Sequence, residues 1–164
     1  MRGELDVQAI FLAGKNEALR SEAEMLAAEA NFPIKVIGYS EEVEQLMRAA
    51  NVMISKLGGL TTFEALNCRV PIIADTITEP MPQEAGTVKS IVKGGAAVML
   101  QRASDIVPIV HRMVEDSKHY AALRAATITI AIPNATRRIV EEITALIPES
   151  GASSDDSLMV EPSS

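Results

Sequence analysis

Short apolar runs and helix-spaced apolar stripes alternate along the chain. The runs at 7–12, 34–37, 52–54, 70–74 and 97–100 are predicted strands, because each is short and is followed by turn-forming or polar residues. Other apolar residues recur at the i, i+3, i+4, i+7 spacing of amphipathic helices. The predicted helices run from 16 to about 30, from 40 to 50, from 62 to 67, from 84 to 93, from 105 to 113, from 118 to 126 and from 134 to about 146.

Four predicted helices begin at a short polar residue. Asn16, Ser40, Asp105 and Asn134 are expected N-caps, because their side chains can accept hydrogen bonds from free backbone N–H groups. The residues expected to face the core are Leu19, Ala23, Leu26 and Ala30 in the first helix, Val43, Leu46, Met47 and Ala50 in the second, Ile106, Ile109, Val110 and Met113 in the fifth, and Ile139, Ile143 and Leu146 in the last.

The alternation of strands and helices predicts the fold class. The predicted strands are apolar on both faces, which is typical of a parallel sheet covered by helices on both sides. We therefore expect an α/β, Rossmann-like, doubly wound parallel sheet over residues 1–148. Residues 149–164 are acidic and rich in serine, with almost no apolar residue to bury, and are predicted to be a disordered tail.

Composition narrows the function classes. The 164 residues suit one domain, and 15 basic against 22 acidic residues give a net charge of −7. This charge disfavours nucleic acid as a partner and disfavours the chain as a primary anchor to anionic lipid. The single cysteine, Cys68, permits no internal disulfide and indicates a reducing compartment. The apolar runs are far shorter than the roughly 18 residues of a transmembrane span, and the first residues lack a signal peptide's apolar region.

The segment 55–64 is the most informative candidate for chemistry. In an open parallel sheet, ligands bind beyond the carboxyl ends of the strands. Gly58 and Gly59, followed by Thr61 and Thr62, place free N–H groups and a helix dipole there, which favours an anion such as a diphosphate. Two structural alternatives remain open: the glycines form only a tight turn, or Thr61 and Glu64 form a capping box.

Gln83 and Glu84 are a second candidate, since an adjacent amide and carboxylate offer donors and acceptors to vicinal hydroxyls. The alternative is a solvated first helical turn. Asp75 is more typical of a turn former than of a ligand.

We predict no metal site and no cofactor, because the sequence has neither an HExxH motif nor a close cluster of histidines and carboxylates. A catalytic triad is not indicated either, and Cys68 is expected to be a buried hydrophobe.

Several segments together resemble one family. Gly14 to Leu19, Val36 to Tyr39, and the stretch Ile54 to Leu66 (ISKLGGLTTFEAL) are similar to the C-terminal half of GT-B glycosyltransferases. The group meant contains monogalactosyldiacylglycerol synthases, processive diacylglycerol glucosyltransferases and the peptidoglycan GlcNAc transferase. The likeness continues through Pro71 to Ile73, Gln83-Glu84 and Gly94 to Ala97, and so covers about residues 7 to 147.

The resemblance implies a donor half that binds a UDP-hexose. It implies that Gly38, Tyr39 and Ser40 face the uracil, that Glu64 holds the ribose diol, and that Gln83 and Glu84 read sugar hydroxyls. The residues implied to face the diphosphate are Gly58, Gly59, Leu60, Thr61 and Thr62. An anion site of this kind can stabilise the departing UDP without a metal.

This chain departs from the family pattern in three ways. Leu57 stands where proline is usual, Pro82 replaces the glycine of a Pro-Gly-Gln-Glu motif, and Thr87 stands where asparagine is common. The resemblance also implies a first strand before Val7 and an N-terminal acceptor domain that carries the catalytic base. The chain by itself is therefore expected to be an inactive donor-binding piece of an inverting hexosyltransferase.

The longer enzyme is expected to act on a lipid acceptor, in the cytoplasm or peripherally at a membrane surface. Two other interpretations stay open: a non-catalytic nucleotide-binding or regulatory module, and an interaction domain whose glycine turn binds nothing.

Overall fold

The structure, a computed structural model, describes residues 6–77 and 81–147, with the side chain of Gln83 excepted. Residues up to Ile132 form one compact unit, and the segment from Pro133 forms a second unit, which is described separately. Strands and helices alternate as predicted. The elements are β1 (Ala9–Gly14), α1 (Glu17–Glu29), β2 (Ile34–Gly38), α2 (Val43–Ala49), β3 (Met53–Ser55), α3 (Gly59–Asn67), β4 (Ile72–Asp75), α4 (Pro82–Lys93), β5 (Ala97–Leu100), a 3-10 turn (Ala103–Asp105), α5 (Ile106–Glu115), α6 (Ser117–Ile130) and α7 (Ala135–Ala145).

All strand pairs are parallel, but the strands form two sheets rather than the single sheet that we predicted. β1 pairs with β2, with Phe11 opposite Val36. β4 lies between β3 and β5, with Ile73 opposite Ile54 and Val98. The α/β class with parallel strands flanked by helices is confirmed. The two sheets are separate in that β1 and β3 do not hydrogen-bond to each other.

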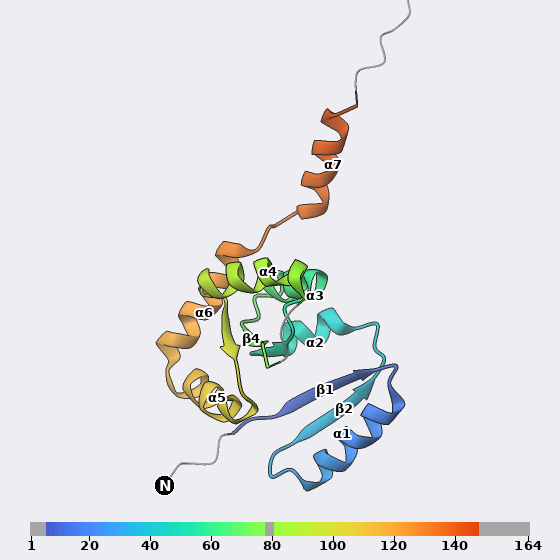
Figure 1. Ribbon diagram of the computed structural model, residues 1–164, viewed down its shortest axis with the longest axis vertical. Helices are drawn as coiled ribbons and strands as arrows, with labels where there is room; N and C mark the ends of the chain where they lie inside the picture. The colour runs from blue at the N-terminus through green and yellow to red at the C-terminus, as the bar shows by residue number, and fades with distance from the viewer. Residues whose placement is uncertain (1–5, 78–80, 148–164) are drawn as a thin grey trace, which may run out of the picture. The chain divides into compact units, whose positions relative to one another are not determined.

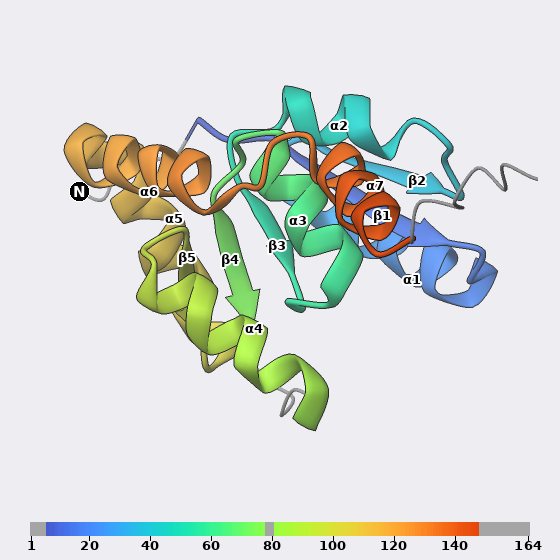
Figure 2. The ribbon, with the colours of Figure 1, turned by 90° about the horizontal axis from the view of Figure 1, so that it is seen from above.

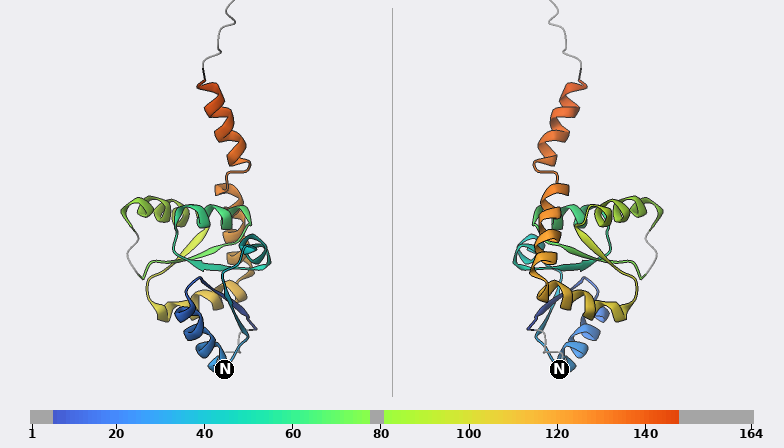
Figure 3. Two further views of the ribbon diagram at one scale, coloured as in Figure 1. Left: turned by 90° about the vertical axis from the view of Figure 1, so that its right-hand side faces the viewer. Right: turned by 90° about the vertical axis from the view of Figure 1, so that its left-hand side faces the viewer.

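β3, β4 and β5 with the helices α2 to α6 make up what we call the three-stranded part. Its core alternates along β4, because successive side chains of a strand point to opposite faces. Ile72 and Ala74 pack with Leu66 of α3, among others, whereas Ile73 packs with Met113 of α5 and Leu123 of α6. Figure 3 shows α3 and α4 on one side of the sheet and α5 on the other. Helices thus cover both faces, as a doubly wound fold requires.

β1, α1 and β2 make up the two-stranded part, which is grouped at the lower right of Figure 1. Of the described residues, none before Val43 belongs to either core cluster of the unit. α1 has no buried residue, and Leu19 and Leu26, which we expected to face the core, are exposed. The prediction for these two leucines is wrong, because a two-stranded sheet offers α1 too little surface to cover its apolar face.

Three of the four predicted N-cap residues, Asn16, Asp105 and Asn134, lie at the N-cap position of a helix, and of these only Asn16 makes the expected side-chain bond. Asn16 Oδ1 accepts the Leu19 N–H at 3.0 Å. Ser40 instead accepts the Glu42 N–H within a turn, and α2 begins three residues after it at Val43. Asp105 pairs with Arg102, and Asn134 makes no side-chain cap bond.

Two helices extend three or more residues beyond their predicted ends, and both extensions follow from packing or turn geometry. α6 continues to Ile130 although the run 127–130 is β-branched and helix-poor by propensity. Thr127 is buried there and Ile130 packs on the core, so burial outweighs propensity. α3 begins at Gly59 rather than at Thr62, which places the glycine turn at the helix start itself.

The second unit contains α7, an amphipathic helix. Within this unit taken by itself, its apolar residues Ile139, Ile143 and Leu146 are exposed, and that they face a core stays a prediction. The predicted tail at 149–164 lies outside the described residues. Over the parts of the chain that the structure describes, no helix has both the length and the apolar character needed to cross a bilayer.

Candidate functional site

The candidate residues lie in loops that follow three parallel strands. Gly38 ends β2, the 58–64 segment follows β3, and Glu84 follows β4. Figure 2 shows β3 and β4 side by side and running in the same direction, with α3 and α4 after them. Because the carboxyl ends of parallel strands share one sheet edge, the second and third of these loops meet at the same edge.

The start of α3 presents three unpaired donors. Gly58 is the N-cap, and its own N–H donates to Lys56 O. In the described part of the chain, the N–H groups of Gly59, Leu60 and Thr61 have no protein acceptor, whereas the next N–H, of Thr62, returns to Gly58 O. Leu60 is strongly exposed, so these donors face solvent at the positive end of the helix dipole. This arrangement suits a multiply charged anion.

Thr62 holds this turn together. It is buried, and its hydroxyl donates to Gly58 O. Because both the hydroxyl and the N–H of Thr62 are engaged inside the protein, Thr62 positions the turn instead of offering a donor to a ligand. Leu57 is buried in the core and anchors the other side of the turn, which accounts for an apolar residue where the family has proline.

The capping-box interpretation of Thr61 and Glu64 is wrong. A capping box needs Thr61 at the N-cap, but Thr61 lies in the third helical position after the N-cap Gly58. Glu64 therefore lies one turn into α3. Its carboxylate is exposed, and no hydrogen bond joins it to another described residue. It is available to a ligand.

The start of α4 lies against the Gly58 turn. A Cβ atom built on Gly58 would lie 3.5 Å from Glu84 Oε1, so the two loops that we singled out separately do meet. Pro82, the departure from the family's glycine, occupies the first turn of α4, where proline is favoured because its missing N–H has no helical partner. Gln83 follows it in the helix, and its side chain lies outside the described residues.

A cavity of about 380 Å³ separates α2 from α3 and includes Glu64. Its charged residues are three glutamates and one arginine, Arg48, whose guanidinium is hydrogen-bonded to Glu44 at 2.7 Å. This bond raises the pKa of Arg48 above its ordinary value. An acidic wall is better suited to hydroxyl groups than to phosphates. The cavity is lined by Glu41, Val43, Glu44, Met47, Arg48, Glu64, Asn67 and Cys68.

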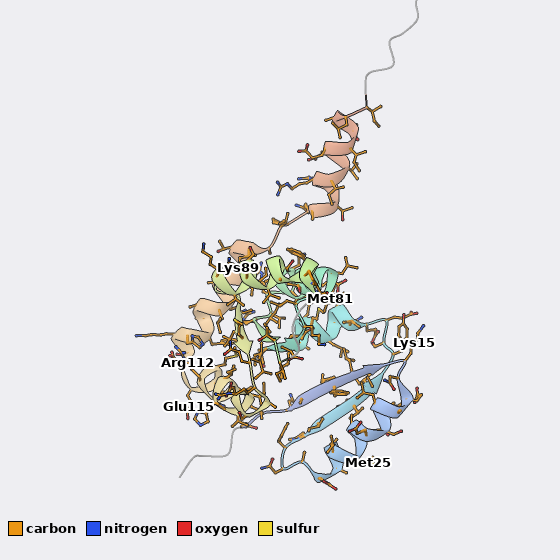
Figure 4. All side chains as sticks on the ribbon, in the orientation of Figure 1. Lys15, Met25, Met81, Lys89, Arg112 and Glu115 are labelled. Atoms are coloured by element: carbon orange, nitrogen blue, oxygen red, sulfur yellow. The ribbon has the colours of Figure 1, made fainter. Side chains whose placement is uncertain are left out.

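The loop after β2 meets the loop after β1. Tyr39 is exposed, and Lys15 Nζ lies 4.8 Å from the centre of its ring, a cation–π distance. Figure 4 shows Lys15 at the end of β1. Ser40 engages its hydroxyl with Glu42 N–H in the same loop. No hydrogen bond or ion pair joins Gly38, Tyr39 or Ser40 to the Gly58 turn in the described residues.

Sequence reasoning missed two residues beside the site. Lys15 was not assigned a role, although its position directly after a strand at the ligand-binding edge was a usable signal. Arg48 lies on the polar side of α2, and only the tertiary structure brings it to the cavity with Glu64.

The other candidates keep structural roles. Asp75 accepts the Ile77 N–H and so forms a turn. His111 pairs with Glu115 on the same helix at 2.9 Å. Cys68 is partly buried, and burial raises the pKa of its thiol, which disfavours the reactive thiolate. The described residues contain no group of three or more histidines, cysteines and carboxylates placed to hold a metal ion.

Sequence comparison decides the family. The profile of the glycosyltransferase family 28 C-terminal domain matches residues 2–143. The chain belongs to this family. The processive diacylglycerol beta-glucosyltransferase of Bacillus cereus (strain G9842) is 31% identical over 141 residues, which are 85% of this chain and 36% of that protein. The enzyme of the same name from Bacillus subtilis (strain 168) is 31% identical over 138 residues, 84% of this chain and 35% of its own length. The family 28 chain thus spans about a third of these curated relatives.

Solved structures share the fold. Acinetobacter baumannii MurG aligns with 88% of the family 28 chain and 43% of its own, with a TM-score of 0.67 and 19% identity. Anabaena HepE, solved in complex with UDP-glucose, aligns with 85% of this chain and 41% of its own, with a TM-score of 0.62 and 19% identity. At these identities the likeness concerns the fold alone. The family match confirms the expected relationship to glycosyltransferases, and the two structures show the expected fold.

Proposed function

We propose that this chain is the donor-binding part of an inverting glycosyltransferase that moves a hexose from a UDP-sugar to a lipid acceptor. The observation that carries the proposal is the set of three free N–H groups at the start of α3, with the Glu84 carboxylate beside them. The names of the Bacillus relatives support the lipid acceptor, and the HepE complex supports a UDP-sugar donor.

Each group of the site has a distinct task in this proposal. The N–H groups of Gly59, Leu60 and Thr61 bind the diphosphate and stabilise the charge of the leaving UDP. Glu64, exposed and unpaired within the described chain, accepts hydrogen bonds from the ribose hydroxyls. Glu84, with Gln83 before it, forms hydrogen bonds with the hydroxyls of the hexose. Gly38, Tyr39 and Ser40 face the uracil.

Transfer also needs a general base for the acceptor hydroxyl, and none of the residues assigned to the donor has that task. We propose that the base and the acceptor site belong to an N-terminal domain of a longer protein, which docks peripherally on a membrane. This chain alone is then expected to show no sugar transfer from UDP-hexoses to diacylglycerol. Transfer above background by the purified 164-residue chain would contradict this assignment.

Comparison of two nucleotides tests the diphosphate site. UDP should bind more tightly than UMP in titration calorimetry, because UMP offers one phosphate to the three N–H groups. Equal affinity for the two nucleotides would place the phosphate elsewhere.

Substitution of Glu64 tests the ribose contact. Glu64→Gln should weaken UDP binding by about 1–3 kcal/mol, the range of a charge-assisted hydrogen bond, and should leave the melting temperature unchanged because Glu64 makes no bond within the described protein. Glu44→Gln is the matched control, since Glu44 lines the same cavity but is paired with Arg48. Unchanged UDP affinity in Glu64→Gln would remove the ribose assignment.

Substitution of Gly58 separates binding from folding. Gly58 is an N-cap in extended conformation, so the side-chain oxygen introduced by Gly58→Ser can accept the Leu60 or Thr61 N–H. The helix should gain a few tenths of a kcal/mol, whereas UDP should bind more weakly because the added hydroxyl competes for its donors. A variant that is more stable and binds UDP as the wild type does would contradict the site.

A further inference from the structure

A carboxylate lies against the turn whose N–H groups suit an anion. Glu84 Oε1 lies 3.5 Å from the position that a Cβ atom on Gly58, the N-cap of α3, would occupy. From such a Cβ, the side-chain oxygen of an N-cap residue reaches the second or third free N–H group of its helix. In α3 these are the N–H groups of Leu60 and Thr61. Glu84 therefore borders directly on the proposed diphosphate site.

The packing of α4 holds Glu84 in this place. Val88 follows Glu84 by four residues and is buried, and Ile91 one turn further is buried as well. Residues three or four positions apart lie on one face of a helix, so Glu84 is on the inward face of α4. Glu84 itself is partly buried, whereas Ala85 and Gly86 after it are exposed. A solvated first helical turn thus describes its neighbours and not Glu84.

The charge of Glu84 is not offset within the described residues. Its carboxylate takes part in no ion pair and no side-chain hydrogen bond there. A glutamate is negative at neutral pH, and a negative charge beside a phosphate site lowers the affinity for phosphate. A neutral amide would also offer a donor and an acceptor to sugar hydroxyls. The charge therefore needs a reason other than hydrogen bonding alone.

Sugar transfer changes the charge of the nucleotide at this place. In a UDP-hexose the diphosphate has two negative charges, because its terminal oxygen is bonded to C1 of the hexose. When that bond breaks, the electron pair stays on the oxygen, C1 bonds to the acceptor oxygen, and the acceptor's proton goes to the general base. The released UDP has a third negative charge above about pH 7, since a phosphate monoester loses its second proton near pH 6.

We infer that Glu84 distinguishes the donor from the product by charge. It accepts hydrogen bonds from the hexose of the donor and repels the third charge of UDP, which favours release of the product. One extra unit charge roughly 6 Å from a carboxylate changes a binding constant about three- to tenfold, at effective dielectric constants of about 80 to 40. The three N–H groups still bind UDP, so its affinity is lowered but not abolished. This inference rests on the proposed function and adds a specificity role for one charge.

Three nucleotides test the discrimination at about pH 8. UDP has the third charge, the β-methyl ester of UDP lacks it, and UDP-glucose lacks it and carries the hexose. Titration calorimetry on the 164-residue chain gives the Kd of each. Glu84→Gln should lower the ratio of the Kd for UDP to the Kd for the methyl ester about three- to tenfold, because the amide is uncharged. The same variant should bind UDP-glucose about three- to tenfold more weakly relative to the methyl ester, because hydrogen bonds to a charged acceptor are the stronger ones.

Two matched variants separate the charge of Glu84 from other effects. Glu84→Asp keeps the charge and should keep the ratio for UDP and the methyl ester within about twofold of the wild type. Glu44→Gln removes the same charge from α2, where Glu44 is exposed and paired with Arg48, and should leave the ratio unchanged. An acid in the first turn also stabilises α4 through the helix dipole, but a change in helix stability acts on the three nucleotides alike and does not move the ratio.

The outcomes distinguish this inference from the proposed donor site. An unchanged ratio in Glu84→Gln would overturn the charge discrimination and leave the donor site in place. An equal fall in Glu84→Asp or in Glu44→Gln would overturn it as well, since the effect would not follow the charge of Glu84. UDP-glucose that binds Glu84→Gln as tightly as the wild type would remove the contact with the hexose. Failure of all three nucleotides to bind the wild type would contradict the donor site, and this inference with it.

Discussion

The three-stranded and two-stranded parts are built from similar strand sequences but differ in burial. β4 (IIAD) and β1 (AIFLAG) are both short and apolar, yet β4 is largely buried whereas Ile10, Phe11 and Leu12 of β1 are exposed. β4 has a strand on each side and helices over both faces, and β1 has one neighbouring strand and one helix, α1. An apolar sequence thus specifies a strand, but the strands and helices packed against that strand decide how much its burial stabilises the fold.

Surface interactions do not account for this difference, because both parts have them. α1 has an N-cap bond from Asn16 and an ion pair between Arg20 and Glu24. α6 has an N-cap bond from Asp116, and Arg102 pairs with Asp105. Since exposed pairs contribute little to stability, packing is what distinguishes the parts. We expect the two-stranded part to open locally at a lower free energy than the rest.

The largest expected effect contrasts one leucine from each part. Leu66→Ala should lower the free energy of unfolding by about 2–5 kcal/mol, because it leaves a cavity in the core beneath α3. Leu12→Ala, in β1, should cost less than about 1.5 kcal/mol, since Leu12 is already partly in water. Urea unfolding curves of both variants measure the difference. Equal losses would mean that β1 is packed as tightly as β4.

Two glycines at α4 give the next contrast. In Gly94→Ala the new Cβ would collide with Ile130 Cδ1 and lie 3.2 Å from Ser90 O, so we expect a loss of about 1–3 kcal/mol. Gly86→Ala adds a methyl group to the same helix with nothing within 4 Å, and should stabilise it by about 0.5–1 kcal/mol. Thermal melts of the pair check both signs. A neutral Gly94→Ala would show that α6 is loosely packed on α4.

The N-cap residues Asn16 and Asp116 test whether the two-stranded and three-stranded parts unfold together. Asn16→Ala and Asp116→Ala each remove one bond to a backbone N–H, worth about 0.5–2 kcal/mol. For Asp116 we expect the loss in the global unfolding midpoint, because α6 belongs to the main core. For Asn16 we expect faster hydrogen exchange in α1 with little change in that midpoint. A matching shift of the midpoint in Asn16→Ala would mean that the two parts unfold together.

The smallest expected effect concerns the exposed pair Arg102–Asp105. The Arg102 guanidinium lowers the pKa of the Asp105 carboxyl below its ordinary value. A lowered pKa stabilises the folded state above the unfolded pKa, and this contribution is lost as the pH falls through the folded value. Asp105→Asn should therefore lower stability slightly at pH 7, not at all in strong acid, and less in high salt. Melts at two pH values and two salt concentrations measure it; an effect larger than that of Leu12→Ala would contradict the dominance of packing.

The sequence by itself determined the elements and the place of the candidate site. Short apolar runs located all five strands, helix-spaced apolar stripes located the helices, and Gly58, Gly59 and Glu84 were singled out from residue chemistry at strand ends. These are local properties, since they depend on residues a few positions apart.

Only the tertiary structure decided the contacts between distant segments. It brought Glu84 to the Gly58 turn, buried Thr62, extended α6 to Ile130 and left the strands in two sheets. The physical reason is that strand pairing and burial depend on which neighbour is present. A strand such as β1 has the same sequence whether or not a partner lies at its free edge.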